Sequence, residues 1–82
     1  MSKMNEVHVT AADKVIESGR ARMVWNKERR SGVTLLVDGK YVANLGGIFE
    51  CAPILKLSLE DTARKYARLA IASLCEEGRI VA

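Results

Sequence analysis

The chain has 82 residues, of which 49% are hydrophobic and 28% are charged, and its net charge is +3. This composition is typical of a small folded domain and excludes a disordered or fibrous chain, so we expect one domain over residues 1–82. The apolar runs at residues 35–37 and 69–72 are too short to cross a bilayer, and residues 1–6 lack the apolar core of a signal peptide. We therefore expect a cytoplasmic protein without a membrane partner.

Three residues, Cys51, Cys75 and His8, are the candidates for metal binding or nucleophilic catalysis. They lack the CxxC or HxxxH spacing of zinc sites, so we predict neither a metal nor another cofactor. Cys75 stands beside two glutamates near the negative end of a predicted helix, which raises a thiol pKa, and Cys51 stands in an apolar segment. We predict free thiols, with one disulfide as the alternative, and no catalytic residue. An enzyme that uses Cys51 or His8 is a third alternative to the two functions weighed below.

The first third of the chain predicts a helix followed by a strand. Thr10 is a good N-cap and Gly19 a good C-terminal stop, so we expect a helix over residues 11–18, with an extended stretch at residues 6–9 before it. From Arg20 onward the sequence alternates with period two, which predicts a half-buried strand. One face of this strand carries Ala21, Met23 and Trp25, and the other carries Arg20, Arg22, Val24 and Asn26.

A β-hairpin is the clearest local pattern in the sequence. Residues 27–32 are predicted to form a polar loop, and residues 33–37 are rich in aliphatic and β-branched side chains, which predicts a central strand. Asp38-Gly39 then favours a type I′ turn into a strand over residues 40–45. The cross-strand pairs expected from a two-residue turn are Val37 with Lys40, Leu35 with Val42, and Val33 with Asn44.

The last part of the chain predicts edge strands and a long helix. Gly46-Gly47 favours a turn, and residues 48–51 are predicted to form a fourth strand that Pro53 confines to a sheet edge. Ser58 is expected to cap a helix that ends at Gly78, and residues 79–82 are interpreted as a further edge strand. The apolar stripe of this helix consists of Leu59, Ala63, Ala67, Ala70, Ile71 and Leu74. The predicted fold is α+β: a short N-terminal helix, an antiparallel β-meander of three or four strands, and a long C-terminal helix packed on one sheet face.

Positive charge is concentrated in two segments of the sequence. In the first segment Trp25 stands among the basic residues Arg20, Arg22, Lys27, Arg29 and Arg30. Clustered cations with an aromatic ring can bind phosphates and stack a base. The alternative is a solvated hairpin tip with Trp25 in the core beside Met23. The second segment lies on the predicted C-terminal helix and contains Arg64, Lys65 and Arg68.

The hairpin at residues 34–42 and the basic run at residues 64–68, which opens an alanine-rich stretch of helix, resemble the double-stranded-RNA-binding domain over about half of the chain. The resemblance implies a helix that reads the shape of a groove more than its sequence. The implied phosphate contacts are Arg64, Lys65 and Arg68. The chain departs from that family by inserting residues 48–57 before the helix and by placing two acids, at residues 60–61, ahead of the basic run.

Two functions follow from these patterns. We predict a non-enzymatic protein that binds nucleic acid or a nucleoprotein complex, provided that both basic segments meet on one surface. The alternative is a small inhibitor or adaptor, of the kind that phages and mobile elements encode, which covers a surface of a host protein such as a defence or nucleic-acid-processing complex. Its contact residues would be Trp25, Tyr41, Phe49 and Leu69. The sheet face that the helix leaves uncovered would bind the protein partner or form a homodimer, and it is expected to carry Leu36, Tyr41 and Ala43.

Overall fold

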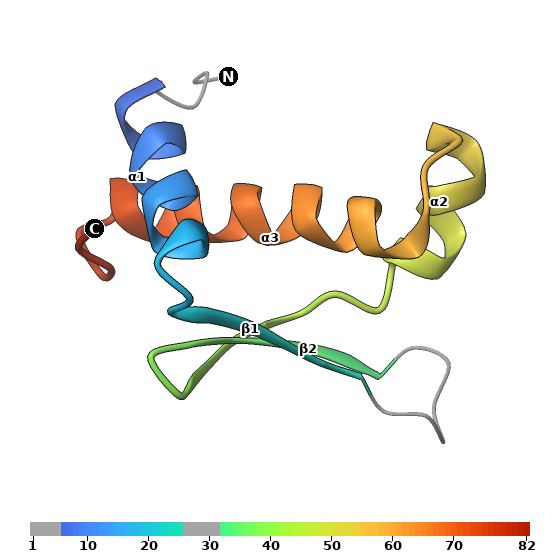
Figure 1. The fold of residues 1–82 in the computed structure, drawn as a ribbon, viewed down its shortest axis with the longest axis horizontal. Coiled ribbons are helices and arrows are strands. Elements are labelled where there is room, and N and C mark those ends of the chain that lie inside the picture. The colour runs from blue at the N-terminus through green and yellow to red at the C-terminus, as the bar shows by residue number, and fades with distance from the viewer. Residues whose placement is uncertain (1–5, 26–31) are drawn as a thin grey trace.

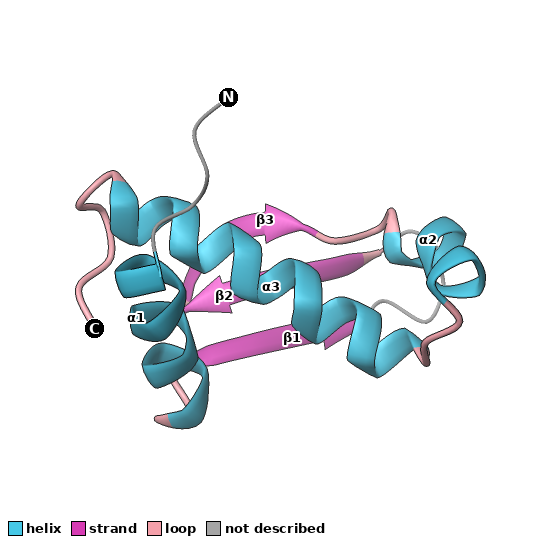
Figure 2. Ribbon diagram, turned by 90° about the horizontal axis from the view of Figure 1, so that it is seen from above, coloured by secondary structure: helices cyan, strands magenta, loops and turns pink. Residues whose placement is uncertain are grey.

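In its described residues the chain forms one helix, a three-stranded antiparallel sheet and two further helices. The computed structural model describes residues 6–25 and 32–82. The elements in chain order are α1 (Glu6–Glu17), β1 (Ala21–Trp25), β2 (Val33–Val37), β3 (Lys40–Asn44), α2 (Ile48–Leu55) and α3 (Leu59–Glu76). Figures 1 and 2 show the described helices on one side of the sheet, with α3 running across it. The predicted α+β class, with a long C-terminal helix against one face of the sheet, is confirmed.

The sheet has the order β1-β2-β3, and an irregularity interrupts the second hairpin. Val37 pairs with Lys40 as predicted, but Leu35 pairs with Ala43 because Val42 is an extra residue in β3. The predicted partners of Leu35 and Val33 in β3 were therefore wrong by one position, since a bulge shifts every pair beyond it. Both Val42 and Ala43 pack against the core, so Ala43 does not lie on the uncovered face where it was expected.

The core lies between β2 and the helices. Alternate side chains of β2 point toward α3 and are buried, and β1 adds partly buried residues on the same side. The alanines of α3 have small side chains, so the helix backbone can lie close to the sheet. The core residues of these elements are Val33, Leu35 and Val37 from β2, Ala63, Ala67, Ile71 and Ala72 from α3, and Ala12 and Val15 from α1.

The N-terminal helix begins earlier than predicted. Residues 6–9 belong to α1 and are not extended, and Thr10 lies within the helix instead of capping it. Val9, Ala12 and Ile16 recur at helical spacing and all pack on the core. This spacing outweighs the alternation of Val7 and Val9 that suggested a strand, because a helix buries one continuous stripe against α3.

The predicted fourth strand is a helix. Residues 48–51 form the first turn of α2, which directly follows the turn at Gly47. Ile48 and Ala52 are four residues apart and both are buried, and the helix packs beside α3. Pro53 is inside this short helix, and Lys56 ends it in a left-handed conformation with φ of 57°. A short apolar run does not distinguish strand from helix by its periodicity, which explains the error.

Helix α3 begins and ends where the sequence predicted, but the C-terminal tail, residues 79–82, differs from the prediction. The Ser58 hydroxyl accepts a hydrogen bond from the backbone N–H of Asp61 at 3.0 Å, which confirms the predicted N-cap. Gly78 follows the helix with φ of 75°, as a C-terminal stop requires. Residues 79–82 form no strand, contrary to the prediction, and instead fold back toward the start of β1 (Figure 1).

Candidate binding surfaces

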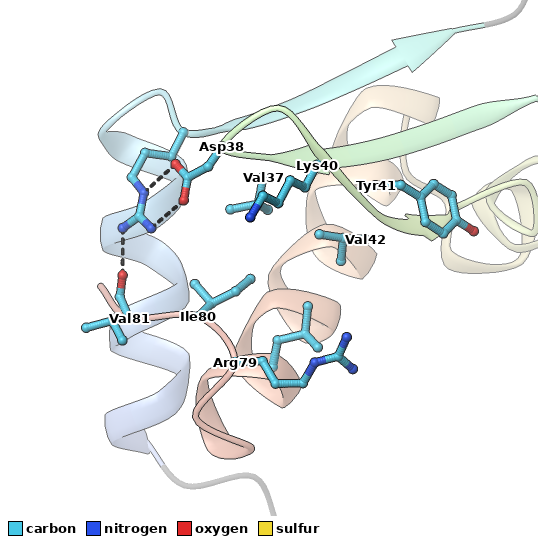
Figure 3. A pocket seen from close by; sticks show the side chains of 10 residues that line it. Val37, Asp38, Lys40, Tyr41, Val42, Arg79, Ile80 and Val81 are labelled. Carbon is cyan, nitrogen blue, oxygen red and sulfur yellow. Dashed lines mark hydrogen bonds and ion pairs between the residues drawn. The ribbon is translucent and has the colours of Figure 1, made fainter.

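Arg20 joins three segments that are distant in the sequence. Its Nε and Nη2 donate to the two carboxylate oxygens of Asp38 at 2.9 and 2.7 Å, and its Nη1 donates to the carbonyl oxygen of Val81 at 2.7 Å (Figure 3). The hydrogen bonds from Arg20 lower the pKa of Asp38, and the same bonds raise the pKa of Arg20. Arg20 is therefore engaged in holding the β2–β3 turn and the C-terminal tail together.

The arginines of α3 also have carboxylate partners. Arg68 donates to both oxygens of Asp13 in α1, at 2.7 and 2.9 Å, which ties the two helices together. Arg64 lies 3.6 Å from Asp61, one turn earlier on its own helix, and both side chains are largely exposed. Lys65 is exposed on α3. Two of the three predicted phosphate contacts on this helix therefore already face a carboxylate.

Arg22 lies on the opposite side of the sheet from α3. Its neighbours Ala21 and Met23 pack against the core, so the alternation of the strand directs Arg22 to the uncovered face. The described cations of the two basic segments thus do not share one surface. The remaining predicted contacts, Lys27, Arg29 and Arg30, lie outside the described residues.

Trp25 is neither fully buried nor free. Its side chain is 39% exposed, and its ring meets that of Phe49 edge-on, with the centroids 6.3 Å apart. The alternative with Trp25 in the core is therefore met only in part, because the ring contacts Phe49 of α2 while more than a third of the residue stays exposed. The exposed part lies at the end of β1.

The uncovered sheet face presents one mixed polar and apolar row. Arg22, Leu36 and Tyr41 are paired across the three strands, and the Tyr41 residue is 66% exposed. Val24 and Thr34 form the adjacent pair. We name this surface the open face and define it by Arg22, Val24, Thr34, Leu36 and Tyr41. Arginine and tyrosine are residue types that often dominate protein interfaces.

A pocket of about 300 Å³ lies between the β2–β3 hairpin and the tail after α3 (Figure 3). The partly buried Val42 and Ile80 supply an apolar floor, while the exposed Lys40 and Arg79 stand at its rim. Arg20 and Asp38 line it on the side of the tail, and Tyr41 belongs both to this pocket and to the open face. We name this feature the hairpin pocket.

A second depression, of about 400 Å³, lies where α2 meets α3. It is mainly apolar and includes Cys51, Tyr66 and Leu69, of which Leu69 is exposed as predicted. A hydrogen bond with Cys51 raises the pKa of Tyr66. The depression can accept an apolar side chain, but it contains no charged group that would orient a ligand.

The two cysteines and His8, the candidates for catalysis or metal binding, form no common site among the described residues. Both cysteines are free thiols. Burial raises the pKa of Cys75, in the predicted direction, although the main cause is burial and not the helix dipole. His8 lies in α1 with a buried Nδ1 that has no hydrogen-bond partner among the described residues. No group of three histidine, cysteine or carboxylate side chains that could hold a metal occurs in the described ranges.

The sequence did not single out Lys40 or Arg79 as site residues. Lys40 carried a usable signal, because its pairing with buried Val37 places it on the helix side of an edge strand. Arg79 carried none, since the path of the tail depends on contacts with Arg20 and the hairpin. Lys40 and Arg79 are 39 residues apart in the chain but line the same pocket. Sequence patterns within one segment do not reveal such a pair.

None of the helices in the described part of the chain has both the length and the apolar character needed to cross a membrane. Comparison of the chain with models of known protein families, with curated proteins and with solved structures finds no match. The surfaces of the molecule are therefore the only indication of its function in the described residues.

Proposed function

We propose that this chain is a non-enzymatic module that binds another protein and covers part of its surface, as a small inhibitor or adaptor in the cytoplasm. The observation that carries the proposal is the open face, where Arg22, Leu36 and Tyr41 stand in one row with no described element over them. A sheet face of this kind exposes apolar area that a partner can cover. Arginine and tyrosine at its ends supply the side chains that commonly anchor such contacts.

The disposition of the arginines favours a protein partner over a nucleic acid. Arg20 and Arg68 each make two hydrogen bonds to a carboxylate, so binding a phosphate there would cost an existing ion pair. Arg22 lies on the other side of the sheet from α3. A polyanion that follows one surface could not contact Arg22 and the arginines of α3 at once, whereas a protein partner can use the open face together with the surfaces that adjoin it.

The decisive experiment compares variants of the open face with matched changes elsewhere. Crosslinked partners are captured from cells after nuclease treatment and identified, and the complex is then rebuilt from purified components to measure its Kd. We expect Leu36→Asp and Arg22→Glu each to weaken binding by at least about tenfold, because each removes a central contact and adds a negative charge.

The matched controls are Leu57→Asp, in the link between α2 and α3, and Lys65→Glu on α3, which make the same changes in charge and polarity away from the open face. Both should leave the Kd unchanged within about twofold, since surface changes away from a contact have small effects. Loss of the complex on nuclease treatment, or equal binding by the variants of the open face, would contradict the proposal.

A further inference from the structure

The open face is too small to hold a protein partner by itself. Three strands of five residues cover about 14 by 17 Å, or roughly 240 Å², from ordinary strand spacings. A stable protein complex usually buries about 800 Å² on each partner. A partner seated on the open face must therefore also contact adjoining surfaces, and the hairpin pocket adjoins it at Tyr41.

The hairpin pocket combines an apolar floor with a positive rim. Val42 and Ile80 lie between Lys40, on one side of the opening, and Arg79 on the other (Figure 3). Both oxygens of the single lining carboxylate, Asp38, accept hydrogen bonds from Arg20. The carboxylate is thus already occupied, while two cations remain at the rim.

The rim cations have weak partners among the described residues. Arg79 lies 3.8 Å from Glu77, and both side chains are more than half exposed. The Lys40 side chain makes no ion pair or hydrogen bond within the described part of the chain, and its charge acts on Asp38, whose pKa it helps to lower, without a direct contact. Exposed pairs of this kind contribute little, so an incoming carboxylate can replace them at small cost.

We propose that the hairpin pocket binds an acidic peptide segment of the protein partner, in which an aliphatic side chain fills the floor and flanking carboxylates pair with Lys40 and Arg79. This inference rests on the proposed function and names the chemistry of the partner. The volume of about 300 Å³ is at the lower end of ligand pockets, which suits a short segment. A free phosphate or a nucleic acid would use the cations but leave the apolar floor empty.

The test uses the whole purified chain and a synthetic peptide with the order Gly-Asp-Leu-Glu-Gly, blocked at both ends. Amide chemical shifts in the NMR spectrum are followed during titration. We expect shifts to concentrate at residues 40–42 and 79–81. A neutral peptide with Asn and Gln in place of the acids, and an acidic peptide with Ala in place of Leu, should each bind several-fold more weakly.

Charge reversal supplies the variants. Lys40→Glu and Arg79→Glu should each raise the Kd of the acidic peptide by about five- to tenfold, because each replaces an attraction with a repulsion at the rim. Lys65→Glu makes the same change on the exposed side of α3 and should have no effect. The spectra themselves show whether each variant is folded.

Several outcomes would overturn the inference. Equal binding of the neutral peptide would do so, as would the absence of shifts at the pocket up to millimolar peptide. Inorganic phosphate or a short single-stranded oligonucleotide that binds there more tightly than the peptide would also overturn it. The titration needs no natural partner, so a failure here leaves the open-face experiment intact, and a failure of the open-face experiment leaves this result standing.

Discussion

At the scale of single residues, side chains that the sequence suggested as ligand contacts also join distant segments of the fold. Arg20 and Arg68 were predicted to contact phosphate, which stays a prediction, and both form paired hydrogen bonds with carboxylates from distant segments. Nothing in the local sequence connects Arg20 with Asp38, 18 residues later, or Arg68 with Asp13, 55 residues earlier. The sequence shows that a residue is positively charged, but only the folded structure shows which carboxylate it contacts.

The Arg20–Asp38 pair has a defined dependence on pH. The pKa of Asp38 is lowered in the folded state, so the unfolded chain binds the proton more readily. The stability that this carboxylate contributes is therefore present above pH about 4, the ordinary range of an aspartate, and is lost as the pH falls through the lowered pKa. Asp38→Asn should lower the melting temperature at pH 7 and flatten its decline in acid.

The measurement is thermal unfolding followed by circular dichroism between pH 2.5 and 7 in the wild type and the variant. Asparagine tolerates the left-handed backbone of Asp38, where φ is 54°, so the change isolates the charge. Glu17→Gln removes a carboxylate from the exposed end of α1 and serves as the control. The same acid dependence in wild type and Asp38→Asn would show that the pair does not contribute.

At the scale of elements, the parts fixed by local chemistry were predicted and the others were not. The turn at Asp38-Gly39 and the N-cap Ser58 each solve a local backbone problem, so their residues identify them. The assignment of α2 depended on its packing against α3, which a short apolar run does not encode. The bulge at Val42 could not be predicted either, because the residues of β3 are compatible with a strand in both the regular and the shifted register.

The type I′ turn predicts a contrast between two glycines. Gly39 has φ of 79°, which disfavours any side chain, whereas Gly47 has φ of −62° and open space around it. Gly39→Ala should therefore lower the free energy of unfolding by about 1 kcal/mol or more, while Gly47→Ala should leave it unchanged or slightly raised. Urea unfolding of both variants measures the difference, and equal midpoints would contradict the assigned turn.

At the scale of the whole molecule, the sheet divides the surface into two unlike sides. The helices cover one side, and the other carries the open face with Arg22 as its cation. The sequence predicted this division and the uncovered face itself, but it placed Ala43 on the wrong side and did not indicate the hairpin pocket. A homodimer through the open face alone would bury far less than the usual area of about 800 Å² per partner.

This division bears on the nucleic-acid hypothesis, which stays a prediction to be tested. The salt dependence of binding counts the phosphates contacted, with a slope of about −0.9 per contact for duplex DNA. Since the described arginines are split and partly paired, we expect weak binding with a shallow slope in fluorescence polarisation with duplex DNA and RNA. A steep slope that Arg22→Glu and Arg68→Glu both reduce would contradict this expectation and favour a polyanion as the ligand.

The bulge in β3 has a consequence for how this small protein can change. Without Val42 the pairs Leu36–Tyr41 and Leu35–Ala43 would follow each other in ordinary alternation, so neither the hairpin nor the open face needs the extra residue. Its side chain instead contributes to the floor of the hairpin pocket. A change in the size of this one side chain would therefore alter both the pocket and a contact with the core, while the pairing of β2 with β3 stays as it is.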